Sequence, residues 1–230
     1  TQRFILLILL LSCITSVFSS DFFHRIAEDN GLSNRRCFSV QQDKHGFMWI
    51  STKLGVDRFD GKNFRHYPLN LFPDQGYNRI GVNYLRCSPD STLWVFSEAG
   101  LLFQYDERKD EFELIYAVRD FFNNHSIILN DVMFDSPETA FLSTSKGVLK
   151  LNLPDRMALL LPGTEELSVN QVNKNDDRYY ISTRDGLYIS IFPQTGPMEV
   201  RFRCLEGKNV LSTYVDMENR RILIGTLDAG

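Results

Sequence analysis

The chain has 230 residues with 25 basic and 29 acidic side chains, which gives a formal net charge of −4. Apolar residues make up 43% and charged residues 23%, so the composition is globular and excludes collagen-like, coiled-coil and wholly disordered chains. Because no surplus of basic residues exists to neutralise phosphates, the charge argues against nucleic-acid binding. Aromatic residues make up 13%, and since these side chains favour strands, we expect an all-β body.

The first twenty residues have the order of a secretory signal. Arg3 precedes an apolar run at residues 4–11, and small and polar residues then continue up to Asp21. A membrane-spanning helix needs about 20 apolar residues, and this segment reaches that length only if its serines and threonines are counted. Residues 1–20 are therefore predicted to be a signal peptide, with a retained N-terminal anchor as the first alternative and lipidation at Cys13 as the second. The body at residues 21–230 is expected in the periplasm.

One eight-residue motif recurs along the rest of the chain. Its first copy, residues 49–56, reads WISTKLGV, and the further copies start at Trp94, Phe141, Tyr180 and Leu223. The repeat glycines are Gly55, Gly100, Gly147, Gly186 and Gly230. These glycines are 45, 47, 39 and 44 residues apart, a period that indicates repeated supersecondary units.

Each repeat has the same order of turns and apolar stretches. An asparagine opens a short apolar stretch, an acidic or proline-containing turn follows, and the motif leads through its glycine into two further alternating stretches. Alternation between turn clusters is typical of antiparallel hairpins, and four such strands in about 40–50 residues make one propeller blade. The sequence therefore predicts an all-β propeller of four-stranded antiparallel blades, with few helices. The repeats are placed at residues 34–82, 83–129, 130–168, 169–209 and, cut short, 210–230.

The first repeat resembles the two-component regulator propeller repeat. Residues 42–61, QDKHGFMWISTKLGVDRFDG, are similar to that family's pattern of Asp, a short turn with Gly, Trp-Ile, Gly-Thr, Gly-Leu and Arg-Tyr-Asp-Gly. Residues 26–34 are similar to the Gly-Leu-Ser-Asn segment before the family's first blade. The resemblance covers nearly everything after residue 21 and is looser in the later repeats. At the position of the motif glycine this chain has Ser51, Phe96, Ser143 and Ser182.

Repeats of this kind typify the periplasmic sensors of hybrid two-component systems, especially in Bacteroides-type bacteria, where many sense glycans. The resemblance implies two seven-bladed propellers followed by a small β-sandwich, a transmembrane helix and a histidine kinase. The present residues supply about five blades of one seven-bladed ring, so we expect the N-terminal part of a larger inner-membrane protein. The resemblance also implies a homodimer of the full-length protein. Membrane contact would come through segments outside this one or through an uncleaved N-terminus.

Three cysteines follow residue 20, namely Cys37, Cys87 and Cys204. An odd number at wide spacing is neither a disulfide framework nor a metal-binding pattern, and we expect three half-buried cysteines in strands. Cys37 and Cys87 are the one pair suited to a disulfide, because both lie at similar places in adjacent repeats.

No nucleotide-binding, serine-hydrolase or metalloprotease motif is present, so the segment is expected to catalyse nothing and to bind no cofactor or metal. Four histidines without a common ligand spacing are present: His24, His45, His66 and His125. His45 is interpreted as a solvated turn residue. Asp60 and Asp106 are expected to serve turns, and the charged run at residues 106–113 to form a solvated hairpin between outer strands.

The recurrent asparagines mark where the innermost strands begin, at the mouth of the central channel. With neighbouring polar residues they form a candidate set for binding the hydroxyl groups of a small molecule or oligosaccharide: Asn34, Arg35, Arg36, Asn83, Arg86, Asn130, Asp131, Asn170 and Gln171. The alternative is that asparagine simply suits the turn into each inner strand. Aromatic residues of the longer loops either stack on a sugar or pack between blades: Phe72, Tyr77, Phe121 and Phe122.

The leading functional hypothesis is a periplasmic ligand-sensing segment of a membrane-bound two-component sensor, with glycan-responsive transcriptional regulation as its output. The alternative from another class is an exported propeller enzyme, a polysaccharide lyase or glycosidase. Such an enzyme needs two carboxylates or a histidine-centred site at the channel, and the repeats supply no such pair. A third hypothesis keeps the sensor and gives it a diguanylate cyclase output. The fold alone does not separate the three, because one fold serves many functions.

Overall fold

Strands make up most of the described chain. The computed structural model describes residues 25–69, 82–124, 126–193 and 196–227, and the helices in these ranges are η1 (Glu28–Asn30) and α2 (Val118–Phe122). Within the same ranges, no helix is long and apolar enough to cross a membrane. The all-β class is confirmed. The expectations for residues 1–20 and for His24, Phe72, Tyr77 and His125 lie outside the described residues.

Consecutive strands pair into antiparallel sheets, which we call blades 1 to 5. Blade 1 contains β1 (Cys37–Gln42), β2 (Met48–Thr52), β3 (Gly55–Phe59) and β4 (Phe64–Tyr67). Blade 2 contains β5 (Asn83–Cys87), β6 (Leu93–Ser97), β7 (Leu101–Asp106) and β8 (Glu111–Ala117). Blade 3 contains β9 (Leu129–Ser136), β10 (Thr139–Thr144), β11 (Gly147–Asn152) and β12 (Met157–Leu160). Blade 4 contains β13 (Val169–Asn175), β14 (Arg178–Thr183), β15 (Gly186–Ile191) and β16 (Glu199–Cys204). Within the described residues, blade 5 contains β17 (Val210–Asp216) and β18 (Arg221–Thr226).

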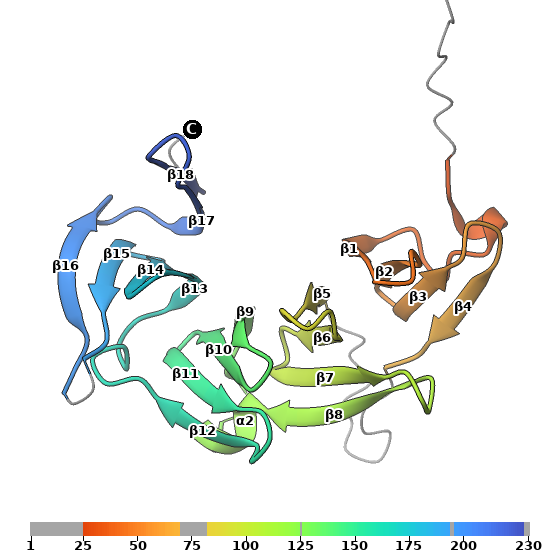
Figure 1. The fold of residues 1–230 in the computed structure, drawn as a ribbon, viewed down its shortest axis with the longest axis horizontal. Coiled ribbons are helices and arrows are strands. Elements are labelled where there is room, and N and C mark those ends of the chain that lie inside the picture. Colours follow the sequence, from red (N-terminus) through yellow and green to blue (C-terminus); the bar gives the residue numbers. More distant parts are fainter. Residues whose placement is uncertain (1–24, 70–81, 125, 194–195, 228–230) are drawn as a thin grey trace, which may run out of the picture.

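The blades fan around a common centre (Figure 1). The first strand of each blade lies innermost, so β1, β5, β9, β13 and β17 face the common centre, where the sequence analysis expects the central channel, and the fourth strands lie on the outer rim. A gap separates β17 and β18 from β1, and the described blades therefore form an open arc. This arrangement is the incomplete β-propeller of four-stranded blades that the repeat period predicts.

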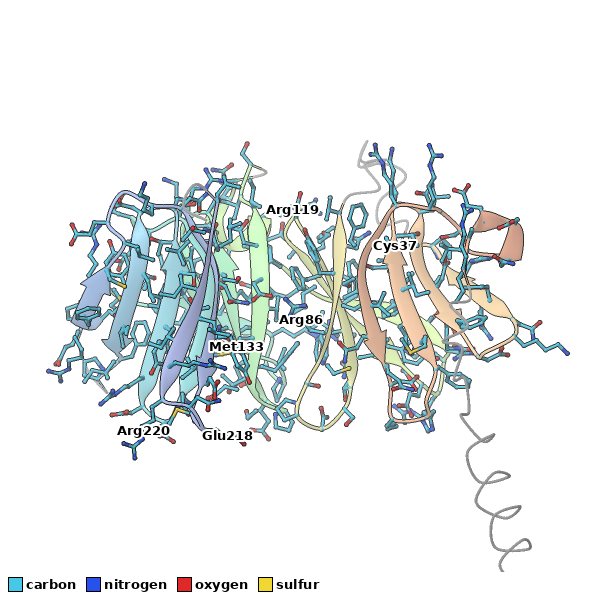
Figure 2. All side chains as sticks on the ribbon, turned by 90° about the horizontal axis from the view of Figure 1, so that it is seen from above. Cys37, Arg86, Arg119, Met133, Glu218 and Arg220 are labelled. Atoms are coloured by element: carbon cyan, nitrogen blue, oxygen red, sulfur yellow. The ribbon has the colours of Figure 1, made fainter. Side chains whose placement is uncertain are left out.

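The arc has two faces, which Figure 2 shows at its upper and lower edges. Cys37 and Arg119 lie at the upper face, and Glu218 and Arg220 lie at the lower face. Because Cys37 at the start of β1 pairs with Thr52 at the end of β2, the turns between second and third strands also lie at the upper face. The turns between first and second strands lie at the lower face.

In blades 1, 3 and 4 the turn after the second strand is closed by a threonine hydroxyl. In blade 1, Thr52 Oγ1 donates to the carbonyl oxygen of Gly55 (3.4 Å) and accepts the backbone N–H two residues after it (3.1 Å). Thr144 and Thr183 make the same two hydrogen bonds in blades 3 and 4. Gly55 has a φ of +129°, and a Cβ there would collide with the carbonyl oxygen of Tyr67, so the position requires glycine. The Ser/Thr-x-x-Gly motif therefore encodes a turn.

The large side chains that begin the motif fill the spaces between blades. Trp49, Trp94, Phe141 and Tyr180 are each at most 6% exposed, and each packs in a hydrophobic cluster with residues of the following blade. Burying a large apolar side chain contributes about 1.5–3 kcal/mol. The aromatic excess of the sequence is thus used mainly to join one blade to the next.

The two end blades each have an uncovered face. Leu223 takes the place of the motif aromatic in blade 5 and is 50% exposed, since no blade beyond it is among the described residues. On the other side of the arc, Val40 of β1 is 55% exposed. Its equivalents in blades 2 to 4, Leu85, Val132 and Val172, are at most 2% exposed. The packing therefore agrees with the open shape of the arc.

The cysteines correct one expectation. All three described cysteines are free, and Cys37 is exposed rather than half-buried. Cys37 begins β1 opposite Thr52, whereas Cys87 ends β5 opposite Leu93, so the two thiols lie at opposite ends of neighbouring strands. The disulfide considered for this pair is wrong, because a disulfide needs Cα atoms within about 7 Å. Burial raises the pKa of all three thiols, which disfavours the reactive thiolate form.

Candidate ligand-binding site

The asparagines that look equivalent in the sequence fall into two groups in the structure. Asn130 and Asn170 are each the extra residue of a bulge in an inner strand, β9 or β13. In blades 1 and 5 a different residue forms the bulge. In blade 2 the first two strands pair without a shift. Asn34 and Asn83 therefore occupy other positions, and the repeat anatomy expected from the asparagines holds only for blades 3 and 4.

The two bulge asparagines tie their blades to the next ones. Asn130 Nδ2 donates to the carbonyl oxygen of Val169, and Asn170 Nδ2 donates to that of Val210, each at 2.7 Å. Val169 and Val210 are the first residues of β13 and β17, so each side chain satisfies a backbone acceptor of the following inner strand. These amides hold neighbouring blades together.

Asn34 and Asn83 have different surroundings. Asn34 Oδ1 accepts the backbone N–H of Arg36 at 2.9 Å, which is the hydrogen bond of an Asx turn. Asn83 is the first residue of β5 and is 4% exposed. The turn interpretation therefore fits Asn34, and the burial of Asn83 leaves little of its surface for a ligand.

Arg86 and Asp131 form an ion pair between the inner strands of blades 2 and 3. Arg86 Nη2 donates to Asp131 Oδ1 at 2.7 Å, and Arg86 Nη1 donates to the carbonyl oxygen of Leu85 at 3.0 Å. The guanidinium carbon lies 5.6 Å from the centre of the Phe96 ring. The Asp131 side chain is 9% exposed and the Arg86 side chain 39%. The guanidinium is thus held by three partners while part of the Arg86 side chain stays exposed, and Figure 2 shows Arg86 in the middle of the row of inner strands.

The surroundings of Asp131 make it dependent on Arg86. Burial raises the pKa of Asp131, and the charge of Arg86, together with hydrogen bonds from the backbone of Val132 and the side chain of Gln171, opposes that rise. A buried carboxylate without a partner costs several kcal/mol. The pair is therefore expected to stay closed, which fixes the orientation of the guanidinium.

Gln171 continues this polar chain toward blade 5. Its side chain is hydrogen-bonded to Asp131, and its Oε1 accepts the backbone N–H of Thr213 at 2.9 Å and a side-chain N–H of Asn173 at 3.1 Å. Of the predicted binding set, the structure thus brings together Arg86, Asp131 and Gln171, which come from three different blades. We call these three residues the channel triad.

The packing of the inner strands explains why an ion pair lies between blades 2 and 3. β1 and β5, β9 and β13, and β13 and β17 lie side by side, whereas β9 approaches β6 rather than β5. At this seam Phe96 replaces the motif glycine and stacks on Tyr84 with a centroid distance of 5.3 Å. The same strand pair in blade 1 has Ser51 and Ser39, and Ser39 Oγ accepts the backbone N–H of Leu85 across the seam at 2.7 Å. The aromatic pair separates the inner strands, and the ion pair spans the wider seam.

Arg35 and Arg36 lie just before β1, at the upper face. Both are exposed. The backbone N–H of Arg35 donates to the Glu28 carboxylate at 3.0 Å, and the carbonyl oxygen of Arg36 accepts the backbone N–H of Lys53 at 3.2 Å. Their backbones are therefore fixed, while their side chains are exposed.

A second polar cluster, which sequence reasoning missed, joins blades 1 and 2 near the outer rim. Asp110, in the turn between β7 and β8, accepts hydrogen bonds from the phenols of Tyr67 (2.6 Å) and Tyr105. The same carboxylate pairs with Arg58 (3.3 Å) and Arg65. Because these groups satisfy one another, the cluster stabilises the contact between the two blades. In the sequence, Arg58 of the repeat pattern was the signal for this cluster. Its partners Tyr105 and Asp110 could not be read from the pattern, because they lie in the next repeat.

The turn aspartates and the hairpin at residues 106–113 largely have the expected roles. Asp60 and Asp106 accept backbone N–H groups of their own turns at 2.6–2.9 Å, which confirms their structural role. Residues 106–113 form the expected hairpin, but the prediction that it is solvated is wrong for Asp110, whose side chain is 26% exposed because the turn folds onto blade 1. His45 is exposed in the turn after β1, as predicted.

The remaining candidates do not converge on the channel triad. His66 Nδ1 lies 2.7 Å from the carboxylate of Asp57, which is buried in blade 1. Phe122 packs against the cluster between blades 2 and 3, and Phe121 is 40% exposed. Among the described residues, no group of three or more histidine, cysteine, aspartate or glutamate side chains is placed to hold a metal ion.

Comparisons with known proteins find similar folds among solved structures. No protein-family model and no curated protein matches the chain. Among solved structures, it is similar to the extracellular domains described for two hybrid two component systems of B. thetaiotaomicron, BT3049 and BT4673. The TM-scores are 0.67 and 0.62 at 21% and 20% identity. The matches cover 88% and 85% of this chain but only 29% and 27% of the solved chains. At this identity the likeness shows the fold, which is the one that the repeat resemblance implies.

The same fold likeness extends to an enzyme. Virginiamycin B lyase from Staphylococcus aureus matches with a TM-score of 0.59 at 10% identity, over 84% of this chain and 71% of the lyase. Sensors and enzymes thus share this arrangement of blades, and the function has to be argued from the side chains.

Proposed function

We propose that the chain is the ligand-sensing propeller segment of a membrane-bound two-component sensor, that it lies in the periplasm, and that its ligand binds in the channel at the channel triad. The observation that carries the proposal is the state of Arg86. Its guanidinium is fixed by the buried Asp131, by a backbone carbonyl and by an aromatic ring, while 39% of the side chain stays exposed. A donor that is ordered before the ligand arrives loses little entropy on binding.

The chemistry of the channel triad suits a hydroxyl-rich ligand. A guanidinium offers several N–H donors in a plane, and a carboxamide offers both donors and an acceptor. Arg86 and Gln171 come from the inner strands of blades 2 and 4, and together they would bind several hydroxyl groups of one ligand. We therefore propose an oligosaccharide, in agreement with the glycan-sensing role that the repeat resemblance implies.

The proposed output lies outside this chain. The chain spans less than a third of the sensor domains that it resembles, and we propose that the kinase and the dimer contacts belong to the rest of the protein. Ligand binding would change the relative stability of two states of that dimer, and only a difference in affinity between the states can drive the change. The segment itself would carry out no chemical step.

The lyase likeness favours one second candidate, an exported enzyme that acts on a polysaccharide. That candidate needs a general base and an acid that converge on the substrate. The carboxylate of the channel triad, Asp131, is buried and paired with Arg86, and His66 lies in blade 1 beside Asp57. The sensing role therefore agrees better with the described side chains.

A thermal-shift screen tests the proposal against this alternative. The full-length protein is heated with a panel of oligosaccharides from partial digests of polysaccharides, and each mixture is then analysed by chromatography. Since binding to the folded state stabilises it by RT ln(1 + [L]/Kd), at least one oligosaccharide should raise Tm and be recovered intact. Arg86→Lys, which keeps the charge but loses the planar donor set, should remove that increase in Tm. Cleavage of the oligosaccharide, or an unchanged increase in Arg86→Lys, would overturn the sensing proposal.

A further inference from the structure

A groove lies between blades 1 and 2, outside the channel triad. Its smaller part, of about 260 Å³, lies between the β1–β2 turn of blade 1 and the turns before β6 and after β7 of blade 2. Its larger part, of about 440 Å³, adjoins the smaller one through three shared residues, Leu93, Tyr105 and Glu107. The larger volume falls within the range of about 300–1,000 Å³ that is typical of ligand pockets. We call the two parts together the blade 1–2 groove.

Arg58 is the ordered donor of this groove. Its Nη1 donates to the phenol oxygen of Tyr105 at 3.0 Å and to the Asp110 carboxylate at 3.3 Å. The guanidinium carbon lies 4.9 Å from the centre of the Phe47 ring and 5.5 Å from that of Trp49, and these contacts hold the group in place. Within the ranges that the structure describes, Nε and Nη2 make no hydrogen bond. Since a guanidinium has five N–H donors, several remain for a ligand in the groove.

Acceptors line the same groove. Glu107, in the turn after β7, accepts a hydrogen bond from Lys44 Nζ at 2.7 Å, and its second carboxylate oxygen lies 3.8 Å from His45 Nε2. These three side chains are about half exposed, and an ion pair so exposed contributes little, so Glu107 can exchange Lys44 for a hydroxyl group of a ligand. Gln104 also lines the groove and makes no side-chain hydrogen bond among the described residues. Its carboxamide offers both donors and an acceptor.

The acidic side chains of the groove already have partners. They are Asp43, Asp106, Glu107 and Glu113. Asp43 and Asp106 accept backbone N–H groups of their own turns. Glu107 is paired with Lys44, and Glu113 with Arg156 at 2.9 Å. An ionic ligand would have to break such a pair, whereas an uncharged ligand can add hydrogen bonds to those already made. The groove therefore favours a neutral ligand.

Apolar surface lies beside these polar groups. Phe47, Tyr105 and the buried Leu93 line the smaller part of the groove. A sugar ring has an apolar C–H face as well as several hydroxyl groups, so it matches aromatic side chains that lie next to N–H donors and carboxylate or amide acceptors.

We propose that the blade 1–2 groove binds uncharged sugar units of an oligosaccharide and is a second binding site outside the channel. Arg58, Glu107 and Gln104 bind the hydroxyl groups of the sugar, and the aromatic side chains contact its C–H face. The inference goes beyond the proposed function, because it requires neither Arg86 nor a ligand in the channel.

Protection of His45 from chemical modification tests this site. His45 lines the groove with 54% of its side chain exposed, and His66, which is 52% exposed and lies outside the groove, is the internal control. Four neutral tetrasaccharides (cellotetraose, xylotetraose, mannotetraose and laminaritetraose) are screened against the full-length protein by saturation-transfer NMR. With the one that binds most tightly, labelling of each histidine by diethyl pyrocarbonate is followed by mass spectrometry. At a concentration about ten times Kd, labelling of His45 should slow about tenfold, and labelling of His66 should not change. Binding of none of the four, or an unchanged rate at His45, would overturn the inference.

Isothermal titration of a matched pair of variants tests the role of Glu107. Glu107→Ala and Glu111→Ala each remove one exposed carboxylate from the same hairpin, but of the two only Glu107 lines the groove. Glu107→Ala should raise the Kd for the tetrasaccharide about tenfold, because hydrogen bonds to charged groups are among the stronger ones. Glu111→Ala should raise it less than about twofold. Equal effects of the two variants would overturn the assignment of the site.

Arg86→Lys separates this site from the channel. Protection of His45 should persist in Arg86→Lys, and this result would sustain the inference even if the proposed function fails. Loss of the protection in Arg86→Lys would show that the groove is no separate site and would overturn the inference. Binding that Arg86→Lys abolishes, together with an unprotected His45, would sustain the proposed function while this inference fails.

Discussion

Arg86 on β5 and Asp131 on β9 are 45 residues apart in the sequence, and their side chains meet at 2.7 Å across the seam between blades 2 and 3. The separation equals one repeat, so the pair is a contact between neighbouring blades. It lies where Tyr84 and Phe96 separate the inner strands. The ion pair thus has two consequences, one for stability and one for the orientation of the guanidinium.

Removing only the cation should be more damaging than removing the pair. Arg86→Met leaves the carboxylate of Asp131 buried without a partner, and we expect the free energy of unfolding to fall by about 3–5 kcal/mol. Arg86→Met/Asp131→Asn removes the buried charge as well and should regain most of that loss. Urea unfolding of both variants measures the difference. Equal losses in the two would show that Asp131 is not stabilised by Arg86.

Asp131 should contribute to the pH dependence of the free energy of unfolding. Its pKa is raised by burial above the ordinary value of 3.8, so the folded protein binds this proton more tightly than the unfolded chain does. The contribution of Asp131 is therefore full below the unfolded pKa and is lost as pH rises through the folded pKa. The unfolding free energy of wild type minus that of Asp131→Asn should fall as pH rises above about 4. A difference that rises with pH would contradict the raised pKa.

The bulge asparagines should matter more than the turn asparagine. Asn170→Ala leaves the carbonyl oxygen of Val210 without its 2.7 Å donor, and we expect a loss of about 1–3 kcal/mol because a buried acceptor becomes unsatisfied. Asn34→Ala removes an exposed turn contact and should cost no more than about 0.5 kcal/mol. Urea unfolding compares the two. Similar losses would show that the asparagines of both kinds are only turn formers.

Much of the blade architecture could be predicted from the sequence because it depends on local contacts. The glycine turn is closed by a threonine three residues away, and the motif aromatics such as Trp49 mark strands that are buried on a fixed face. The partners of Arg86 and Asp110 could not be predicted, since each lies in another blade and depends on the register between sheets. The disulfide considered between Cys37 and Cys87 was wrong for the same reason. A repeat counted from its asparagines placed both cysteines alike, whereas the strand register puts them at opposite ends.

The repeat glycine offers a test of that local part. Gly55→Ala places a Cβ against the backbone carbonyl of Tyr67 at a φ of +129°, and we expect a loss of at least about 2 kcal/mol. Gly61 also has a positive φ, +95°, but nothing lies within 4 Å of a Cβ there, so Gly61→Ala should cost only the backbone strain of about 1 kcal/mol. Thermal unfolding of the two variants separates collision from strain. A smaller loss in Gly55→Ala than in Gly61→Ala would contradict this account of the turn.

The central claim is that a ligand binds in the channel at Arg86. The most direct measurement is isothermal titration of the oligosaccharide selected by the thermal-shift screen into wild type, Arg86→Lys and Arg201→Lys. Arg201 is an exposed arginine on β16 that pairs with Glu199, and it serves as the matched control far from the inner strands. We predict that Arg86→Lys raises Kd by at least about tenfold, equivalent to about 1.4 kcal/mol, while Arg201→Lys leaves Kd unchanged. Equal Kd values for all three proteins would contradict the claim.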